Sequence, residues 1–148
     1  MSRGDSRVAP IKMAPSEARQ LLERGIALYN AGEFFECHEV LEGLWRVDSS
    51  EYRDLYQGVI KAAVAWYHAQ RGNFTGARKV LHSGLRQLRS YVNRETPLDL
   101  DPFIHTLERA LPEIEHCERS AARFDPKMIP PLRWNRRCPA VGDSERSS

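Results

Sequence analysis

The stretch GEFFECHEVL, residues 32–41, recurs 40 residues later as GNFTGARKVL, residues 72–81. Glycine, phenylalanine, valine and leucine occupy equivalent positions in the two copies, and the small residue Cys37 corresponds to Ala77. In each copy the glycine ends one helical pattern of apolar residues, and a second helical pattern follows it. The sequence therefore predicts two helical hairpins that resemble tetratricopeptide repeats. Because an open solenoid generally needs three or more such units, we expect a compact bundle that a further helix closes.

Outward from the repeat, apolar residues at helical spacing predict five helices. We expect a last helix starting at Pro102, after four others at about residues 17–30, 33–46, 51–70 and 74–92. Ser16 and Asp101 are the expected N-cap residues, and Pro112 is expected to kink or split the last helix. No stretch alternates with a period of two, so no strand is predicted. The predicted fold class is all-α, a compact bundle of about five helices.

Length and composition bound the domain organisation and the class of partner. The chain has 148 residues, 28% of them charged, which suits one helical bundle domain over residues 16–124. We expect residues 1–15 to form a flexible arm and residues 125–148 to form a Pro/Arg-containing tail, largely extended or disordered. Within that tail, the apolar stretch 128–134 is expected to lie extended against the bundle.

The same figures restrict location and partners. A formal charge of +2 is too small to indicate nucleic-acid binding. The chain contains no apolar run of the roughly 20 residues that a membrane span requires. Three widely spaced cysteines and the lack of a signal-peptide pattern predict a cytoplasmic protein whose thiols are free.

The second predicted helix places two ionisable side chains among large rings. At about 100° per residue, His38 and Glu42 lie between Trp45 and Phe35, inside the apolar arc. A carboxylate or an imidazole in apolar surroundings must find a partner or lose its charge. Because His38 and Glu42 are one turn apart, they can bond each other or hold a ligand jointly.

The third predicted helix carries a polar stripe, Asp54, Gln57, Lys61 and His68, beside a row of small residues. Small residues let another helix approach closely, which brings the stripe near a neighbour's side chains. We therefore predict a polar pocket between the second and third helices, whose binding residues are His38, Glu39, Glu42, Trp45, Gln57, Lys61 and His68. The alternative is that His38 and Glu42 form a buried polar network that only fixes helix packing.

Three runs of sequence carry a family resemblance. The run AGEFFECHEVLEGLWR at residues 31–46, the run YQGVIKAAVAWYH at residues 56–68 and the run RGNFTGA at residues 71–77 resemble, in this order, the signature of the domain of unknown function family 309. The resemblance implies an all-α bundle, and it places on the family's motif positions His38, Glu39, Glu42, Trp45, Gln57 and His68. The family has no established activity, so the resemblance implies a fold and the location of a site.

Two classes of function fit these residues. The first is a binding module for an unknown protein or a small ligand. The alternative is a metal-dependent hydrolase, in which His38, Glu42 and His68 ligate a divalent ion and Glu39 is the general base. No other cofactor is predicted.

The fourth and last predicted helices each add one feature. The fourth carries arginines and no acidic residue. It is expected either to pair with acidic residues of the second helix, for example Arg78 with Glu42, or to present a basic face to a phosphate or an acidic partner. In the last helix, Glu113 and His116 have the Glu-x-x-His spacing of di-iron bundles, but those bundles use the motif twice.

Overall fold

The computed structural model describes residues 15–135. They form five α-helices and one 3₁₀ turn, namely α1 (Pro15–Asn30), α2 (Phe34–Val47), α3 (Arg53–Gln70), α4 (Phe74–Arg89), α5 (Leu100–Ser120) and η1 (Pro126–Met128). These described residues contain no strand, only an isolated bridge between Leu98 and Trp134. The prediction of an all-α bundle of about five helices is therefore confirmed. The expected arm up to residue 14 and the expected tail beyond residue 135 lie outside the described residues.

The two copies of the repeat form the same helix-ending turn. Gly32 and Gly72 have φ angles of 82° and 78°, in the left-handed region that glycine adopts at little cost. The N–H of Gly32 bonds to the carbonyl three residues back at 3.0 Å, and the N–H of Glu33 to the carbonyl five residues back at 2.9 Å. The second copy repeats both bonds, which are those of the Schellman motif. Each glycine thus ends one helix and lets the chain turn back into the next.

Three details of the helix bounds differ from the prediction. Helix α1 begins at Pro15, so Ser16 is not the N-cap; proline is favoured at a helix start because no intrahelical bond needs its missing N–H. Helix α5 begins at Leu100, so Asp101 lies in the first turn, where its carboxylate faces the positive end of the helix dipole. Helix α5 also continues through Pro112 without splitting, because buried side chains on both sides of the proline hold it on the core.

The ends of α3 and α4 differ from the prediction as well. Helix α3 starts two residues later than expected because a turn occupies the preceding positions. There the Asp48 carboxylate accepts a hydrogen bond from the N–H of Ser50, and the Ser50 hydroxyl accepts one from the N–H of Tyr52. Helix α4 ends at Arg89 rather than near Val92.

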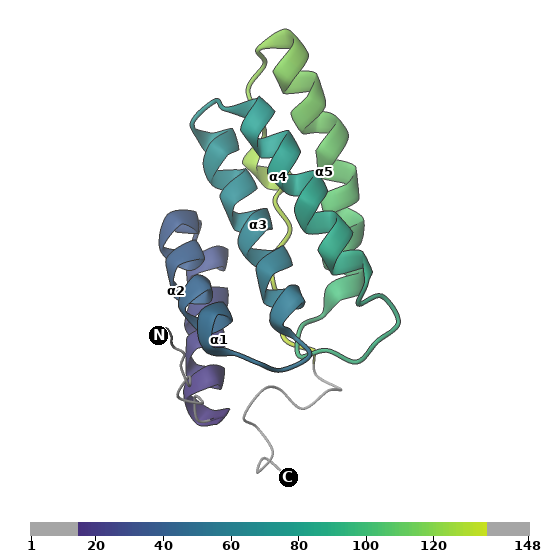
Figure 1. Ribbon diagram of the computed structural model, residues 1–148. Coiled ribbons are helices and arrows are strands. Elements are labelled where there is room, and N and C mark those ends of the chain that lie inside the picture. Colours follow the sequence, from purple (N-terminus) through teal and green to yellow (C-terminus); the bar gives the residue numbers. More distant parts are fainter. Residues whose placement is uncertain (1–14, 136–148) are drawn as a thin grey trace, which may run out of the picture.

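Each helix packs on its neighbour along the chain, α1 on α2, α2 on α3, α3 on α4 and α4 on α5 (Figure 1). The approach of α3 and α4 is especially close. A methyl group added at Gly84 would lie 3.1 Å from the carbonyl oxygen of Gly58. The row of small residues on α3 therefore allows α4 to approach closely. The likeness of the two hairpins to tetratricopeptide repeats remains a prediction.

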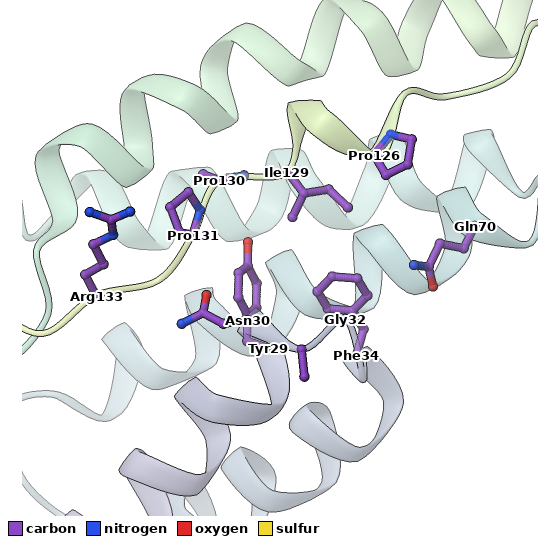
Figure 2. A pocket seen from close by; sticks show the side chains of 11 residues that line it. Tyr29, Asn30, Gly32, Phe34, Gln70, Pro126, Ile129, Pro130, Pro131 and Arg133 are labelled. Atoms are coloured by element: carbon purple, nitrogen blue, oxygen red, sulfur yellow. The ribbon is translucent and has the colours of Figure 1, made fainter.

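After α5 the chain turns back and runs along the helices towards the end of α1 (Figure 1). Figure 2 shows this returning segment passing over Tyr29 and Asn30. The carboxamide of Asn30 donates to the carbonyl oxygen of Leu132 and accepts from its N–H, both at 2.9 Å. The side chain of Leu132 is fully buried, so residues from both ends of the described chain meet in one core.

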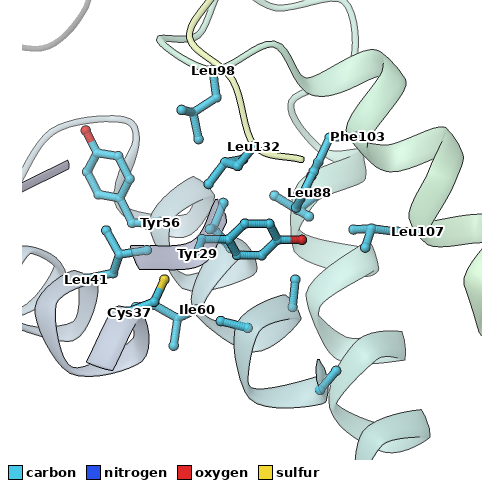
Figure 3. Close-up of a cluster of buried hydrophobic side chains, with 14 of the residues drawn as sticks. Tyr29, Cys37, Leu41, Tyr56, Ile60, Leu88, Leu98, Phe103, Leu107 and Leu132 are labelled. Carbon is cyan, nitrogen blue, oxygen red and sulfur yellow. The ribbon is translucent and has the colours of Figure 1, made fainter. Parts of the chain in front are cut away.

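Tyr29 lies at the centre of that core (Figure 3). Its ring packs edge-on against Phe34 and Phe103, and its hydroxyl oxygen accepts a hydrogen bond from the Trp66 indole N–H at 2.9 Å. Burial holds the pKa of the Tyr29 hydroxyl far above its usual value. The tyrosine thus connects α1, α2, α3 and α5. Among residues 15–135, no helix combines the length and apolar character needed to cross a membrane.

Candidate functional site

The residues predicted to share a pocket separate into two groups. Gln57 and Lys61 bond to α4 rather than facing α2. The Gln57 side-chain oxygen accepts a hydrogen bond from Gln87 at 2.5 Å, and the Lys61 ammonium donates to the hydroxyl of Ser83 at 2.7 Å. These two residues lie on the same side of α3 as the small residues that bring it against α4. Their contacts therefore connect two helices.

The candidate metal ligands are not brought together either. His68 lies near the end of α3, where its Nδ1 is 3.4 Å from the side-chain nitrogen of Asn73. His38 and Glu42 lie together on α2, with 3.8 Å between Nε2 and Oε1. Among residues 15–135, no three His, Cys, Asp or Glu side chains are grouped so that they could hold a metal ion. The ligand set that the hydrolase alternative requires is thus not assembled, and neither is one around the Glu-x-x-His motif of α5.

Of the α2 members of the predicted site, His38, Glu42 and Trp45 are half-buried and Glu39 is exposed. The side chains of His38 and Glu42 are 26% and 36% exposed, and Glu42 also lies 3.4 Å from a guanidinium nitrogen of Arg46. The Nδ1 of His38 and the indole N–H of Trp45 are buried and have no hydrogen-bond partner among the described residues. The guanidinium of Arg53 covers the Trp45 ring at 4.2 Å. A closed polar network would satisfy such atoms, so this edge of α2 is not a completed structural network.

A row of four rings crosses from α2 to α3 beside these residues. The ring of Phe35 lies 5.6 Å from that of His38 and 5.5 Å from that of Tyr67, and the rings of Tyr67 and His68 are 6.1 Å apart. The guanidinium of Arg71, the residue that follows α3, lies 5.4 Å from the centre of the Tyr67 ring. We call His38, Phe35, Tyr67 and His68 the aromatic row.

Phe35 is the most exposed ring of the aromatic row, and its side chain is the only one of the four without a polar atom. Its relative exposure is 46%, and Val92 is the other large hydrophobic residue exposed in the described part of the chain. Exposing such a ring costs free energy that burial would recover. From the sequence, Phe35 is predicted only on the flank of the apolar arc, and no pattern singles out Tyr67. The signal that could have found the surface is that Thr75 replaces Phe35 in the second copy of the repeat.

Three exposed carboxylates lie on α2 or just before it, and α2 also carries Phe35 and His38 of the row. Glu33, Glu36 and Glu39 are exposed, and no ion pair involving them is present in the described residues. Glu39, the candidate general base, lies one turn from Phe35 on this exposed side. The row therefore lies beside an acidic helix surface.

The arginines of α4 do not neutralise that surface, so the predicted Glu42–Arg78 pair is wrong. Arg78 instead makes two hydrogen bonds to Glu118 of α5, at 2.7 and 3.1 Å, and Arg89 bonds to Glu108 at 3.0 Å. The bond from Arg78 holds the pKa of the Glu118 carboxyl below its usual value, and a hydrogen bond from Thr75 acts in the same direction. The basic residues of α4 are matched to α5 because α5, rather than α2, packs beside them.

Comparison with known proteins places the chain among uncharacterised relatives. An uncharacterised protein of Bacillus subtilis (strain 168), YpuF, is 39% identical over 70 residues, which is 47% of this chain and 40% of that protein. An uncharacterised protein of Aquifex aeolicus (strain VF5) is 27% identical over 97 residues, which is 65% of this chain and 29% of that protein. The chain therefore matches less than half the length of either relative. No solved structure gives a significant match.

The match to a protein family covers a shorter stretch of the chain than the matches to these two relatives. It covers residues 22–80, which include α2, α3 and the aromatic row, and it is to a domain of unknown function, DUF309. This range also contains both copies of the repeat, except for the last residue of the second copy. The resemblance to the domain of unknown function family 309 that the sequence motifs predicted is thus confirmed over residues 22–80.

Proposed function

We propose that this protein is a protein-binding module and that the surface formed by α2 and α3 docks a basic segment of a partner. The observation that carries the proposal is the aromatic row, in which Phe35 of α2 is 46% exposed between His38 and Tyr67. Large rings that remain exposed on a folded chain are typical of interaction sites. The proposal narrows the predicted binding module to one surface.

The partner's charge follows from the residues around the row. Three exposed carboxylates, Glu33 just before α2 and Glu36 and Glu39 on it, attract cationic side chains from a distance and favour partners of that sign. The faces of Phe35 and Tyr67 then offer positions for a guanidinium or an ammonium group. The chain already shows such contacts within this surface, since Arg71 covers Tyr67 and Arg53 covers Trp45. An arginine-containing segment is therefore the partner that this chemistry favours.

The form of the surface favours a macromolecule over a small ligand. Sites for small molecules usually enclose most of the ligand. The aromatic row instead lies on two helix surfaces, and Phe35 and the neighbouring carboxylates are exposed. The Nδ1 of His38 and the indole N–H of Trp45 lie at the same edge of α2 and have no partner among the described residues. A peptide segment can cover such a surface and still place polar groups at its border.

The test compares two variants that each remove one exposed hydrophobic side chain. Phe35→Ala removes the centre of the proposed surface, and Val92→Ala removes the other exposed hydrophobic residue, beyond the end of α4. Both variants are titrated with arginine-containing peptides and with peptides in which aspartate replaces each arginine. We expect the wild type and Val92→Ala to bind the basic peptides alike. Phe35→Ala should bind them about two- to fivefold more weakly, since one exposed cation–π contact stabilises by about 0.5–1 kcal/mol.

Two results would contradict the proposal. One is equal binding of basic and acidic peptides by the wild type. The other is binding of the basic peptides that Phe35→Ala leaves unchanged while its circular dichroism spectrum remains that of the wild type.

A further inference from the structure

A second surface of the molecule, independent of the aromatic row, is covered by the chain's own residues 121–135. Helix α5 ends at Ser120, and the next residue, Ala121, has a φ of 59° in the left-handed region, where the chain reverses. The segment then returns across α3 and α1 (Figure 1). Apart from the single 3₁₀ turn η1, it contains no helix. We call residues 124–134 of this segment the strap.

The first anchor of the strap is an aromatic contact. The ring of Phe124 stacks on that of Trp66, with 5.7 Å between the ring centres and 14° between the planes. Trp66 is fully buried in α3 and donates its indole N–H to Tyr29. The floor under the strap is therefore a rigid part of the core.

The second anchor of the strap is a pair of hydrogen bonds to its backbone. The carboxamide of Asn30 bonds to both the N–H and the carbonyl oxygen of Leu132, each at 2.9 Å. This pair of bonds is what a neighbouring strand offers to an extended chain, and it does not depend on the strap's side chains. The side chain of Leu132 is fully buried beside Leu98 and Leu88 (Figure 3). Asn30 and this apolar site together recognise an extended backbone and an aliphatic side chain.

The prolines before Leu132 suit the same arrangement. Pro130 is buried and Pro131 is exposed. Proline has no N–H that burial would leave without a partner, and it restricts the chain to an extended conformation before it docks. Beyond Leu132, the N–H of Asp99 bonds to the carbonyl of Arg133 at 2.9 Å, which continues the extended pairing.

The site that holds the strap is wider than the strap. A cavity of about 540 Å³ lies on one side, between Tyr29, Phe34 and Gln70 of the helices and Ile129 and Pro130 of the strap (Figure 2). A second cavity of about 580 Å³ lies near Phe74 and Phe124. Both cavities are open towards solvent beside the strap, so the strap occupies an open groove that it does not fill.

We infer that this groove is a receptor for extended, proline-containing segments and that the strap is its intramolecular ligand. A partner segment that fits carries an aromatic residue and, eight residues later, an aliphatic residue preceded by proline, as Phe124 and Leu132 are spaced here. Because the strap is tethered, its effective concentration is of the order of millimolar. It therefore competes with a partner and sets the affinity at which the groove opens to one.

The experiment uses the full chain and, as probe, a fluorescent peptide with the sequence of residues 122–135. Leu132→Ala in the protein weakens the strap and leaves the groove intact, so this variant should bind the peptide at least tenfold more tightly than the wild type. Lys127→Ala, which changes an exposed residue of the strap, is the matched control and should bind like the wild type. Adding Asn30→Ala to Leu132→Ala removes the backbone contact and should abolish the gain.

Three results overturn the inference. The first is that Leu132→Ala keeps its helical spectrum and gains no affinity for the peptide. The second is that the peptide binds the wild type and all variants equally. The third comes from a measurement on the wild type alone, which tests the inference even if Leu132→Ala unfolds. Amide hydrogen exchange should show the N–H groups of Leu132 and Asp99 exchanging together, at least a hundredfold faster than those in the middle of α3. Exchange at the rate of α3 would make the strap an inseparable part of the fold.

Discussion

Replacing Gly84 by alanine tests the close contact between α3 and α4 that gives Gln57 and Lys61 their partners. The added Cβ would lie 3.0 Å from the Cβ of Lys61 and 3.1 Å from the carbonyl oxygen of Gly58. Ordinary carbon contacts are about 3.5–4.0 Å, so the helices must separate. Overpacking of this kind costs about 1–3 kcal/mol, and the better helix propensity of alanine recovers up to about 1 kcal/mol. We expect a net loss of up to about 2 kcal/mol in the free energy of unfolding.

The matched control is Gly43→Ala on α2. A Cβ at Gly43 would have no atom within 4 Å, so only the helix propensity changes, and the variant should be more stable than the wild type by about 0.5–1 kcal/mol. Urea unfolding followed by circular dichroism at 222 nm measures both changes, and they should have opposite signs. If Gly84→Ala is as stable as Gly43→Ala, the close approach of α3 and α4 is not real and the assignment of Gln57 and Lys61 to that contact is lost.

Three further predictions concern single side chains. Glu118→Gln should be less stable than the wild type at pH 7; because the folded pKa of Glu118 is lowered, the difference should be present above the usual carboxyl value of about 4.3 and vanish as the pH falls through the folded value in acid unfolding titrations. Tyr29→Phe removes the acceptor of a buried indole N–H and should cost about 1–3 kcal/mol in urea unfolding, and an unchanged midpoint would count against that bond. Burial raises the pKa of the Cys37 thiol to about 12, and that of the Cys117 thiol in the same direction. With Cys138 replaced by serine, the native protein should therefore resist iodoacetamide at pH 8, and rapid labelling of both thiols without urea would contradict their burial.

Much of the fold could be predicted from the sequence because its signals are local. Gly32 and Gly72 each follow an apolar helical pattern, and each one adopts the left-handed turn that such a position favours. Helix ends were less accurate where two residues compete for the same role. Pro15 starts α1 in place of Ser16 as its cap, and Pro112 is tolerated because contacts far along the chain hold α5 together.

The site was predicted less completely because it depends on which helices meet. The position of His38 beside a large ring follows from the periodicity of α2, and the structure places its ring 5.6 Å from that of Phe35, with Glu42 one turn further along the helix. The row of small residues indicated that some helix approaches α3, but not which one. That helix is α4, so Gln57 and Lys61 lie on the side away from the row. The contact between Phe35 and Tyr67 joins two helices, and no pattern within either helix encodes it.

The acidic surface of α2 illustrates the same point for charge. Complementary charges on α2 and α4 suggested a pair between Glu42 and Arg78. Pairing depends on which helices are adjacent, and Arg78 lies beside Glu118 of α5. The carboxylates of α2 thus remain available at the aromatic row, which is the basis for assigning a basic partner.

The most direct test of the aromatic row as a docking surface is chemical-shift mapping of the isotopically labelled full chain with an arginine-containing peptide. We expect the largest amide and ring shifts at Phe35, His38, Tyr67 and His68, and we expect them to diminish as salt is raised. Shifts confined to α4 and α5, or no shifts at millimolar peptide and low salt, would contradict the account.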